Sequence, residues 1–289
     1  MKFGWFGVGT GVLGDLSGVI EGGREVERLG YESVWLGEHV VLVDPQASPS
    51  PLPPTAPMLD PIVVLAHLAA STTTLRLGIG VIVLPFRNAL VLAKQLASLD
   101  VLSAGRLMVG IGVGGVPGEF SAVGVPFERR GRVADEAIDV LRALWSLPQP
   151  AYVGELMSFS GVQSHPQPTQ PGGIPIHGSG MSSAALRRSA QRCDGWYGFQ
   201  LDLRRTEEVL DRLRGCLRPA GRRPLEITVT PPSHSFSSAD VDRYADLGVD
   251  RLVVMGDFAG LGRSPSPEGR SAALADMRRY AEMIGLDPA

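Results

Sequence analysis

The sequence predicts an α/β fold, a (β/α)8 TIM barrel with insertions after strand 2 and between helix 4 and strand 5. Short apolar runs bounded by Gly or Pro, which are typical of parallel strands buried on both faces, recur along the chain. Longer amphipathic segments alternate with them. Eight such pairs fit the length of 289 residues, because one barrel takes about 250. We therefore expect a single domain over residues 1–289.

The expected elements follow one another in strand–helix order. In the helix expected over residues 129–147, Ala137, Val140, Leu141 and Leu144 recur at helical spacing. The expected strands span residues 2–8, 33–36, 76–83, 107–113, 174–177, 195–199, 225–230 and 251–255. The expected helices span residues 17–29, 61–71, 89–102, 129–147, 183–192, 204–217, 238–247 and 268–284.

Two segments interrupt this alternation. Residues 44–57 (DPQASPSPLPPTAP) are rich in Pro and Ser, so they form neither a helix nor a central strand. Long loops of this kind in a compact domain are often functional. Residues 148–173 contain short alternating runs separated by turn residues, and this pattern predicts a small hairpin.

An open dinucleotide-binding sheet is the alternative fold. Gly7, Gly9 and Gly11 follow the first strand and loosely match the glycine spacing of that fold. The matching pattern also requires an acidic residue at the end of a second strand, about 20 residues later. No acidic residue stands at that place, although Glu38 comes nearest, so this signal is weak and the barrel is the better interpretation.

Composition narrows the function classes. The net charge of −3 has no block of one sign, which argues against binding to nucleic acids or membrane surfaces. The two cysteines, Cys193 and Cys216, have neither disulfide-framework nor zinc-site spacing, and no histidine set suggests a metal. No leader or bilayer-spanning run is expected, so we predict a soluble protein of the cytoplasm.

The active site of such a barrel lies at the carboxyl ends of its strands. Glu38 and His39 directly follow the second strand. His39 could donate a hydrogen bond or a proton to a cofactor ring or a substrate, or it could be a structural histidine held by a loop carbonyl. Glu38 could act as an acid or a base, although carboxylates at strand ends are also common on protein surfaces.

Two glycine-rich turns at the same end are candidates for cofactor binding. Gly112, Val113 and Gly114 follow the fourth strand, and glycine there permits close backbone approach or simple packing. The turn 178–182 opens a helix, whose free N–H groups bind anions such as phosphate, or it is an ordinary helix cap. Its candidate residues are Gly178, Ser179, Gly180, Met181 and Ser182.

Several segments together resemble the luciferase-like monooxygenase superfamily, and within it the branch that uses the deazaflavin F420. The resemblance lies in ESVWLGEHV at 32–40, in residues 75–114 with LDVLSAGR at 99–106, in residues 118–145, and in PIHGSGMSSAALRRSAQRCDGW at 175–196. It covers the chain to about residue 200. It implies a (β/α)8 barrel, commonly a homodimer, with the cofactor ring across the barrel mouth.

The resemblance also implies roles for individual residues. Glu38 and His39 stand where an acid–histidine pair faces the deazaflavin, although that acid is more often Asp. Val81, Ile82 and Val83 match a bulged strand behind the ring, with a non-prolyl cis peptide at Val81–Ile82. The turns at 112–115 and 178–182 would contact the cofactor tail.

One position departs from the family pattern. Sugar-phosphate dehydrogenases of this group carry a glutamate in the turn after strand four, where this chain has Gly115. The next glutamate, Glu119, lies four residues farther along and is not expected to point inward. Glucose 6-phosphate is therefore not the expected substrate.

The leading hypothesis is an F420-dependent oxidoreductase that transfers a hydride between the deazaflavin C5 and a small organic molecule. The protein would orient cofactor and substrate and exclude water, while the cofactor supplies the redox chemistry. One alternative is an FMN-dependent monooxygenase, in which reduced flavin activates oxygen. Another is a protein that binds flavin without turnover, because a fold does not guarantee chemistry.

Overall fold

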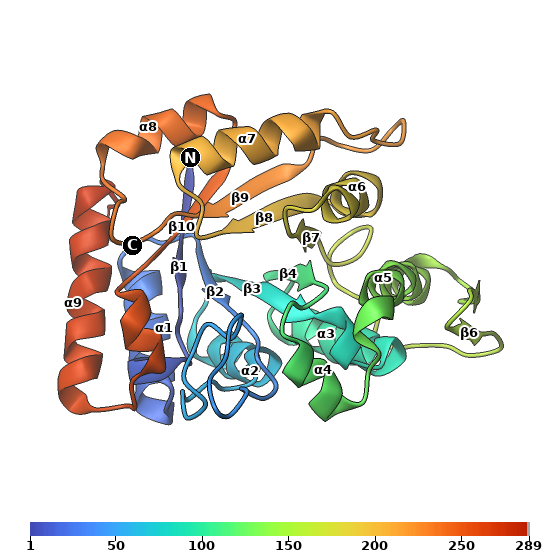
Figure 1. Cartoon of the computed structure of the whole chain (residues 1–289), viewed down its shortest axis with the longest axis horizontal. Helices are drawn as coiled ribbons and strands as arrows, with labels where there is room; N and C mark the ends of the chain where they lie inside the picture. Colours follow the sequence, from blue (N-terminus) through green and yellow to red (C-terminus); the bar gives the residue numbers. More distant parts are fainter. Residues whose placement is uncertain (288–289) are drawn as a thin grey trace.

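The computed structural model describes residues 1–287 and shows a closed barrel of parallel strands inside a ring of helices (Figure 1). The last strand pairs with the first and closes the sheet, which confirms the predicted barrel. The final residues of the predicted domain, 288–289, lie outside the described part. The barrel strands are β1 (Lys2–Phe6), β2 (Ser33–Leu36), β3 (Arg76–Val83), β4 (Leu107–Gly112), β7 (Ile176–Ser179), β8 (Gly195–Phe199), β9 (Glu226–Thr230) and β10 (Arg251–Met255).

Most helices begin at a polar side chain that accepts hydrogen bonds from the free N–H groups of the first turn. Asp60, Asn88 and Ser182 are examples. Among the helices within residues 1–287, none is both long and apolar enough to cross a membrane. The helices are α1 (Leu16–Arg28), α2 (Pro61–Ser71), α3 (Ala89–Leu102), α4 (Pro117–Val123), α5 (Arg130–Ser146), α6 (Ser183–Arg192), α7 (Leu203–Arg214), α8 (Ala239–Asp246) and α9 (Pro267–Met283).

Two differences from the sequence-based expectation affect the candidate site. Strand β7 begins at Ile176, two residues later than expected, because Pro175 has no N–H to donate to the sheet. Gly178 and Ser179 therefore belong to the strand, and only the three residues after them form the turn. The short helix α4 follows β4 where no helix was expected, and it ends at Gly124 in the left-handed conformation (φ 72°).

Large side chains fill the barrel interior. The rings of Trp35 and Tyr197 stack with their centroids 5.2 Å apart and their planes 2° from parallel. Nearer the amino ends of the strands, Arg251 is fully buried and forms ion pairs with Glu32 at 2.9 Å and Glu226 at 3.1 Å. Because this interior is packed, a ligand of the barrel has to bind above the aromatic pair, at the carboxyl ends of the strands.

Both predicted insertions are present. The loop between β2 and α2 returns to the barrel mouth, where Met58 pairs with Thr10 in an isolated bridge and Leu52 is buried. The predicted hairpin consists of β5 (Tyr152–Val153) and β6 (Ser158–Phe159). The carboxylate of Glu136 in α5 accepts hydrogen bonds from three successive backbone N–H groups of its turn, residues 155–157, and so anchors the hairpin.

Candidate active site

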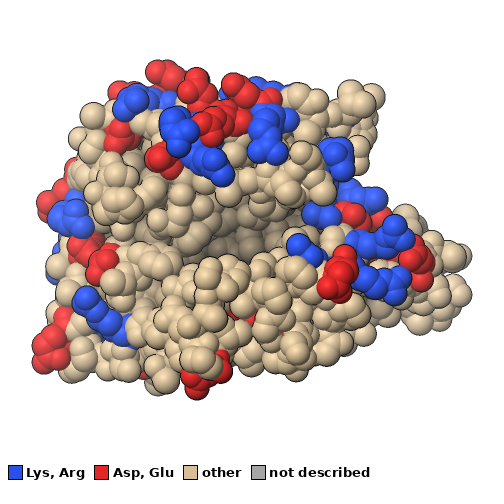
Figure 2. Space-filling view, viewed as in Figure 1, with Lys and Arg blue, Asp and Glu red and all other residues tan. Residues whose placement is uncertain are grey.

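A cavity of about 260 Å³ opens at the carboxyl ends of the barrel strands. We call it the mouth cavity. Figure 2 shows a hollow at the centre of one face of the molecule whose walls are mostly uncharged, with Lys, Arg, Asp and Glu gathered farther out. The mouth cavity has apolar and aromatic walls with a few polar groups, as small-molecule sites commonly do. Its main lining side chains are Phe6, Glu38, His39, Leu52, Met58, Val81, Ser179, Tyr197, Phe199, Phe258 and Leu261.

Strand β3 bulges below this cavity. The pairing of β3 with β4 shifts register between Ile79 and Ile82, so Gly80 and Val81 form the bulge, and the Gly80–Val81 peptide is cis. Both features lie earlier in the strand than predicted: the bulge was expected over residues 81–83 and the cis bond at Val81–Ile82. A Cβ at residue 80 would lie 2.9 Å from Cζ of Tyr197, so only glycine fits at this position of the strand beside the ring.

The bulge decides which side chains of β3 reach the cavity. Val81 lines it. Ile82 is fully buried in the apolar layer between the barrel and the helices, because alternate residues of a strand point to opposite faces. Val83 is also buried, and its backbone N–H donates to the Glu38 carboxylate at 2.6 Å. Of the three candidates in this strand, the structure brings only the Val81 side chain to the mouth cavity.

Glu38 is held by several partners. Its Oε2 accepts from the N–H of Val83, and its Oε1 accepts from Nε of Arg87 at 2.9 Å and also from the Arg87 Nη2. Arg87 in turn pairs with Asp60 at 2.6 Å. Burial of the carboxylate raises the pKa of Glu38 and outweighs the opposite effect of Arg87. Both oxygens of Glu38 are thus engaged by groups that connect β2, β3 and the start of α2.

His39 forms a close pair with Glu119, which is not among the predicted site residues. Its Nδ1 lies 2.6 Å from Oε1 of Glu119, and the Glu119 side chain is only 3% exposed. The expectation that Glu119 does not point inward is therefore wrong, because α4 turns this side chain toward the barrel. An ionised carboxylate only accepts hydrogen bonds, so Nδ1 carries the proton and Nε2 is the ring nitrogen available to a ligand.

The turn after β4 packs against its surroundings. A Cβ at Gly112 would lie 2.8 Å from Val81, and Gly114 has a positive φ of 74° beside the Phe120 ring. Val113 is partly buried against the main core. None of these three residues lines the mouth cavity, so their predicted contact with a cofactor tail stays a prediction.

The five candidate residues at and before the start of α6 also differ in their surroundings. Ser179 lines the mouth cavity, and Ser182 caps the helix by accepting from the N–H of Ala185. Gly178 allows close packing on α6, since a Cβ there would lie 2.2 Å from Oγ of Ser189. Gly180 is needed for its φ of 103°, and Met181 is 38% exposed. The helix start and Ser179 remain as the groups that could bind an anion.

A second, outer cavity of about 510 Å³ lies beyond His39. His39, Glu38 and Met58 line both spaces. The outer cavity continues between α2 and α3, past Arg87 and Val91. His39 and Glu38 therefore stand between two spaces that could each receive part of a ligand.

Several lining residues were missed by sequence reasoning. Phe6 and Phe199 stand at the ends of their strands, and their position could have identified them. Glu119 lies in the segment that carries the family resemblance, but the short helix that aims it inward had no clear periodic signal. Phe258 and Leu261 belong to a 3-10 helix, η4 (Phe258–Gly262), which has no recognisable pattern in the sequence. Within residues 1–287 no three potential metal ligands gather.

Sequence comparison finds relatives along the whole described chain. The model of the luciferase-like monooxygenase family matches residues 1–287. An uncharacterised protein of Mycobacterium tuberculosis is 30% identical over 270 residues, covering 90% of this chain and 92% of that protein. An F420-dependent glucose-6-phosphate dehydrogenase of Kineococcus radiotolerans is 31% identical over 205 residues, covering 68% of this chain and 57% of the relative.

Solved structures share the fold. The monooxygenase RslO1 from Streptomyces bottropensis superposes with a TM-score of 0.78 at 21% identity, covering 98% of both chains. An F420-dependent secondary alcohol dehydrogenase, solved with an F420–acetone adduct, gives a TM-score of 0.76 at 13% identity, again over 98% of both chains. At these identities the similarity establishes the fold alone.

Proposed function

The chain belongs to the luciferase-like monooxygenase family, and we propose that it is an F420-dependent oxidoreductase that transfers a hydride between the cofactor and a small organic substrate. The observation that carries this proposal is the His39–Glu119 pair, 2.6 Å apart, at the edge of an apolar cavity in the barrel mouth. The F420-dependent relative supports the choice of cofactor, and the F420-dependent structural neighbour is an example of this fold binding F420.

His39 is the proposed catalytic residue. Moving a hydride to or from an alcohol or carbonyl carbon also moves a proton on the adjacent oxygen, and this proton needs an acceptor or donor. With Nδ1–H directed at Glu119, Nε2 of His39 can hold or release that proton. The buried carboxylate fixes the tautomer and the orientation of the ring, in the way that a third group orients the base in other catalytic sets.

Glu38 has a different proposed part. Its oxygens are engaged by Arg87 and by the N–H of Val83, so it does not exchange protons with substrate. It acts as a positioning residue that keeps the β3 bulge beside His39. This assignment modifies the hypothesis that Glu38 is itself an acid or a base.

The described residues fit a planar cofactor ring. Val81 offers an aliphatic face to the mouth cavity, and Phe6, Phe199 and Phe258 offer aromatic ones. Ser179 and the N–H groups at the start of α6 would hold a phosphate of the cofactor tail. When bound there, F420 would supply the hydride chemistry at its C5.

An FMN-dependent monooxygenase is the second candidate. The monooxygenase RslO1 shares this fold with a TM-score of 0.78, which is the observation in its favour. The apolar walls of the mouth cavity suit FMN as well as F420, so the two cofactors have to be separated by experiment.

We further propose that the protein is a homodimer. The side chains of Val63 in α2 and Val91 in α3 are 68% and 56% exposed, and the two helices are neighbours. Burying this apolar surface against a second copy would cover the outer cavity on which Val91 lies. We also propose that it is a single-domain protein of the cytoplasm, where the thiols of Cys193 and Cys216 would stay reduced.

A turnover screen tests the oxidoreductase proposal. The purified protein is incubated with oxidised F420 and a panel of primary alcohols, secondary alcohols and polyols, and the visible absorbance of F420 is followed. The reverse direction uses reduced F420 with aldehydes and ketones. We expect at least one class to turn over, and the His39→Ala variant to be slower by about 10²-fold or more. Turnover with reduced FMN and oxygen, and none with F420, would favour the second candidate instead.

A further inference from the structure

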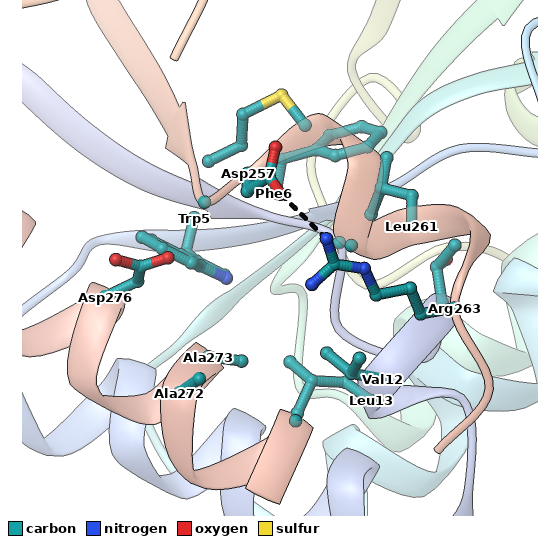
Figure 3. Close-up of a pocket in the computed structure, with 16 residues that line it drawn as sticks. Trp5, Phe6, Val12, Leu13, Asp257, Leu261, Arg263, Ala272, Ala273 and Asp276 are labelled. Atoms are coloured by element: carbon teal, nitrogen blue, oxygen red, sulfur yellow. Dashed lines mark ion pairs between the residues drawn. The ribbon is translucent and has the colours of Figure 1, made fainter. Parts of the chain in front are cut away.

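A separate pocket of about 110 Å³ lies beside the mouth cavity, between the barrel wall and α9 (Figure 3). We call it the side pocket. It is bounded by the ends of β1 and β10, by η4 and by the first half of α9. Phe6, Thr10 and Leu261 line both the side pocket and the mouth cavity, so these three residues form the wall between them. The remaining residues of this pocket have no role in the proposed reaction.

Two largely buried residues, Trp5 and Thr10, line this space with polar groups that have no protein hydrogen-bond partner in the described part of the chain. Trp5 is 2% exposed, and Figure 3 shows its indole nitrogen pointing toward the space between Asp276, Ala273 and Arg263. Its ring is fixed by edge contacts with Tyr31 and Tyr280, each 5.9 Å between centroids. Within residues 1–287 the indole N–H makes no hydrogen bond.

Thr10 is the second such group. It is 4% exposed, and its hydroxyl has no hydrogen-bond partner in the described part of the chain. Neither polar atom is sealed from the pocket, so a molecule bound there can reach both of them. A donor-only indole and a hydroxyl that both donates and accepts therefore offer a bound molecule two unfilled positions.

The charges around the side pocket are already balanced. Asp276 accepts a hydrogen bond from Arg279 at 2.8 Å, and Asp257 pairs with Arg263 at 3.8 Å. An anion would lie close to two carboxylates, and a cation would compete with two arginines. The pocket therefore favours an uncharged ligand.

The size of the pocket limits the ligand further. A cavity of about 150 Å³ accommodates benzene, so this smaller space accepts about four or five non-hydrogen atoms. Val12, Leu13, Ala272 and Ala273 give it aliphatic walls. The fitting chemistry is a short carbon chain with a hydroxyl group, which can accept from Trp5 and donate to the Asp276 carboxylate or to Thr10.

We propose that the side pocket is a second binding site, distinct from the cofactor and reaction site, for a small neutral molecule or group that carries a hydroxyl on a short carbon chain. Trp5 is its hydrogen-bond donor, Thr10 its second polar contact, and the α9 alanines its floor. Leu261 separates this ligand from the mouth cavity.

Fluorine NMR of the full chain labelled with 5-fluorotryptophan tests this proposal without any cofactor, so its result is independent of the proposed reaction. The chain has four tryptophans, and the Trp5→Phe variant identifies the Trp5 signal. Propane-1,2-diol is the probe, and propionate and propylammonium are the charged comparisons. We expect the diol to shift the Trp5 signal saturably, with the other three signals unmoved and neither ion producing that shift.

Blocking variants complete the test. Ala273→Leu fills the pocket from α9, and Ala272→Leu narrows its rim at an exposed position that tolerates substitution. Both should abolish the saturable shift. The matched control is Ala275→Leu, which adds the same side chain at an exposed site of α9 outside the pocket and should retain it. The proposal is overturned if the diol does not shift the Trp5 signal, if it shifts all four tryptophan signals, or if either ion produces the same shift. It is also overturned if both blocking variants keep the saturable shift.

Discussion

At the scale of single residues, the candidate site contains two glutamates, Glu38 and Glu119. The one that is distant in the sequence, and not the one adjacent to His39, contacts the imidazole. Glu38 is adjacent to His39 in the chain, yet its carboxylate is tied to Arg87 and to the N–H of Val83. Glu119 is 80 residues away from His39, yet it makes the 2.6 Å contact with the imidazole. Sequence adjacency points to Glu38, but it cannot show which acid faces the histidine, because that depends on the direction of the short helix α4.

Substitution of the pair should separate catalysis from binding. His39→Ala removes the proposed proton carrier and should lower kcat by about 10²-fold or more, with little change in F420 affinity. Glu119→Gln keeps the shape but can no longer ensure that Nδ1 carries the proton, so a smaller loss is expected. The measurements are steady-state turnover on the substrate class found by the screen and fluorescence titration of F420. Unchanged turnover in His39→Ala would show that His39 is not the proton carrier of the reaction.

The same comparison can identify the part played by Glu119. If Glu119 only orients the imidazole, Glu119→Asp should recover part of the activity that Glu119→Gln loses, and the pH dependence of kcat should differ between the two variants. If the two variants behave alike and also unfold at lower denaturant concentration, the pair is structural.

At the scale of elements, the barrel strands were predictable and the local departures from regularity were not. Strands β2, β3, β8 and β10 have the bounds that their apolar runs predict, because hydrophobic patterning alone determines which segments are buried. The bulge in β3 was placed by resemblance, and it lies earlier than expected. Its position depends on the contact between Gly80 and Tyr197, two residues on separate strands that no local pattern connects.

The bulge gives a prediction about stability. Gly80→Ala places a Cβ 2.9 Å from Cζ of the fully buried Tyr197, and this overpacking should lower the free energy of unfolding by about 1–3 kcal/mol. The matched control is Gly115→Ala, because no atom lies within 4 Å of a Cβ at residue 115. Urea denaturation of both variants is the measurement. Equal stability of the two would mean that the strand relaxes freely around Tyr197 and that the bulge is not fixed by this contact.

At the scale of the whole molecule, the barrel has two different ends. The mouth is apolar and holds the candidate site, whereas the opposite end of the interior holds a buried ionic group centred on Arg251, with Glu32 and Glu226. His177 lies in this group, 3.5 Å from Glu226 and edge-on to Trp35. The sequence could predict a charged or polar strand start, but the closure of the barrel is what brings β2, β7, β9 and β10 together there.

This buried group should make the fold sensitive to acid. Burial lowers the pKa of His177 to about 4 from its usual 6.5. Between these pH values the unfolded chain binds a proton at this histidine and the folded chain does not. The free energy of unfolding should therefore fall by about 3 kcal/mol as the pH drops from 6.5 to 4. Urea denaturation across this range measures it. His177→Gln should flatten this dependence, whereas the exposed His234→Gln should not; a dependence that survives His177→Gln would refute the assignment.

Glu226 adds to this dependence at lower pH. Burial alone would raise the pKa of Glu226, but Arg251 and Lys2 hold it well below its usual value. Its contribution to stability is therefore present above the ordinary pKa of glutamate and is lost below it. The loss due to His177 should begin first, between pH 6.5 and 4, which separates the two groups experimentally.

The proposed dimer is tested at the same scale. Combining Val63→Glu with Val91→Glu places two charges on the exposed apolar face of α2 and α3 and should convert the dimer into a monomer. Light scattering after size-exclusion chromatography measures the mass. Leu217→Glu, at a side chain that is 85% exposed elsewhere on the molecule, is the control and should leave the mass unchanged. A wild-type protein that elutes as a monomer would contradict the proposal directly.

The central claim, an F420 site in the barrel mouth, is tested most directly by an equilibrium fluorescence titration of the purified protein with F420 and, separately, with FMN. We predict saturable binding of F420 at least tenfold tighter than that of FMN, and weaker F420 binding when Val81→Asp places a charge on the aliphatic face of the mouth cavity. Tighter binding of FMN would contradict the cofactor assignment. F420 binding that is unchanged by Val81→Asp would contradict its location.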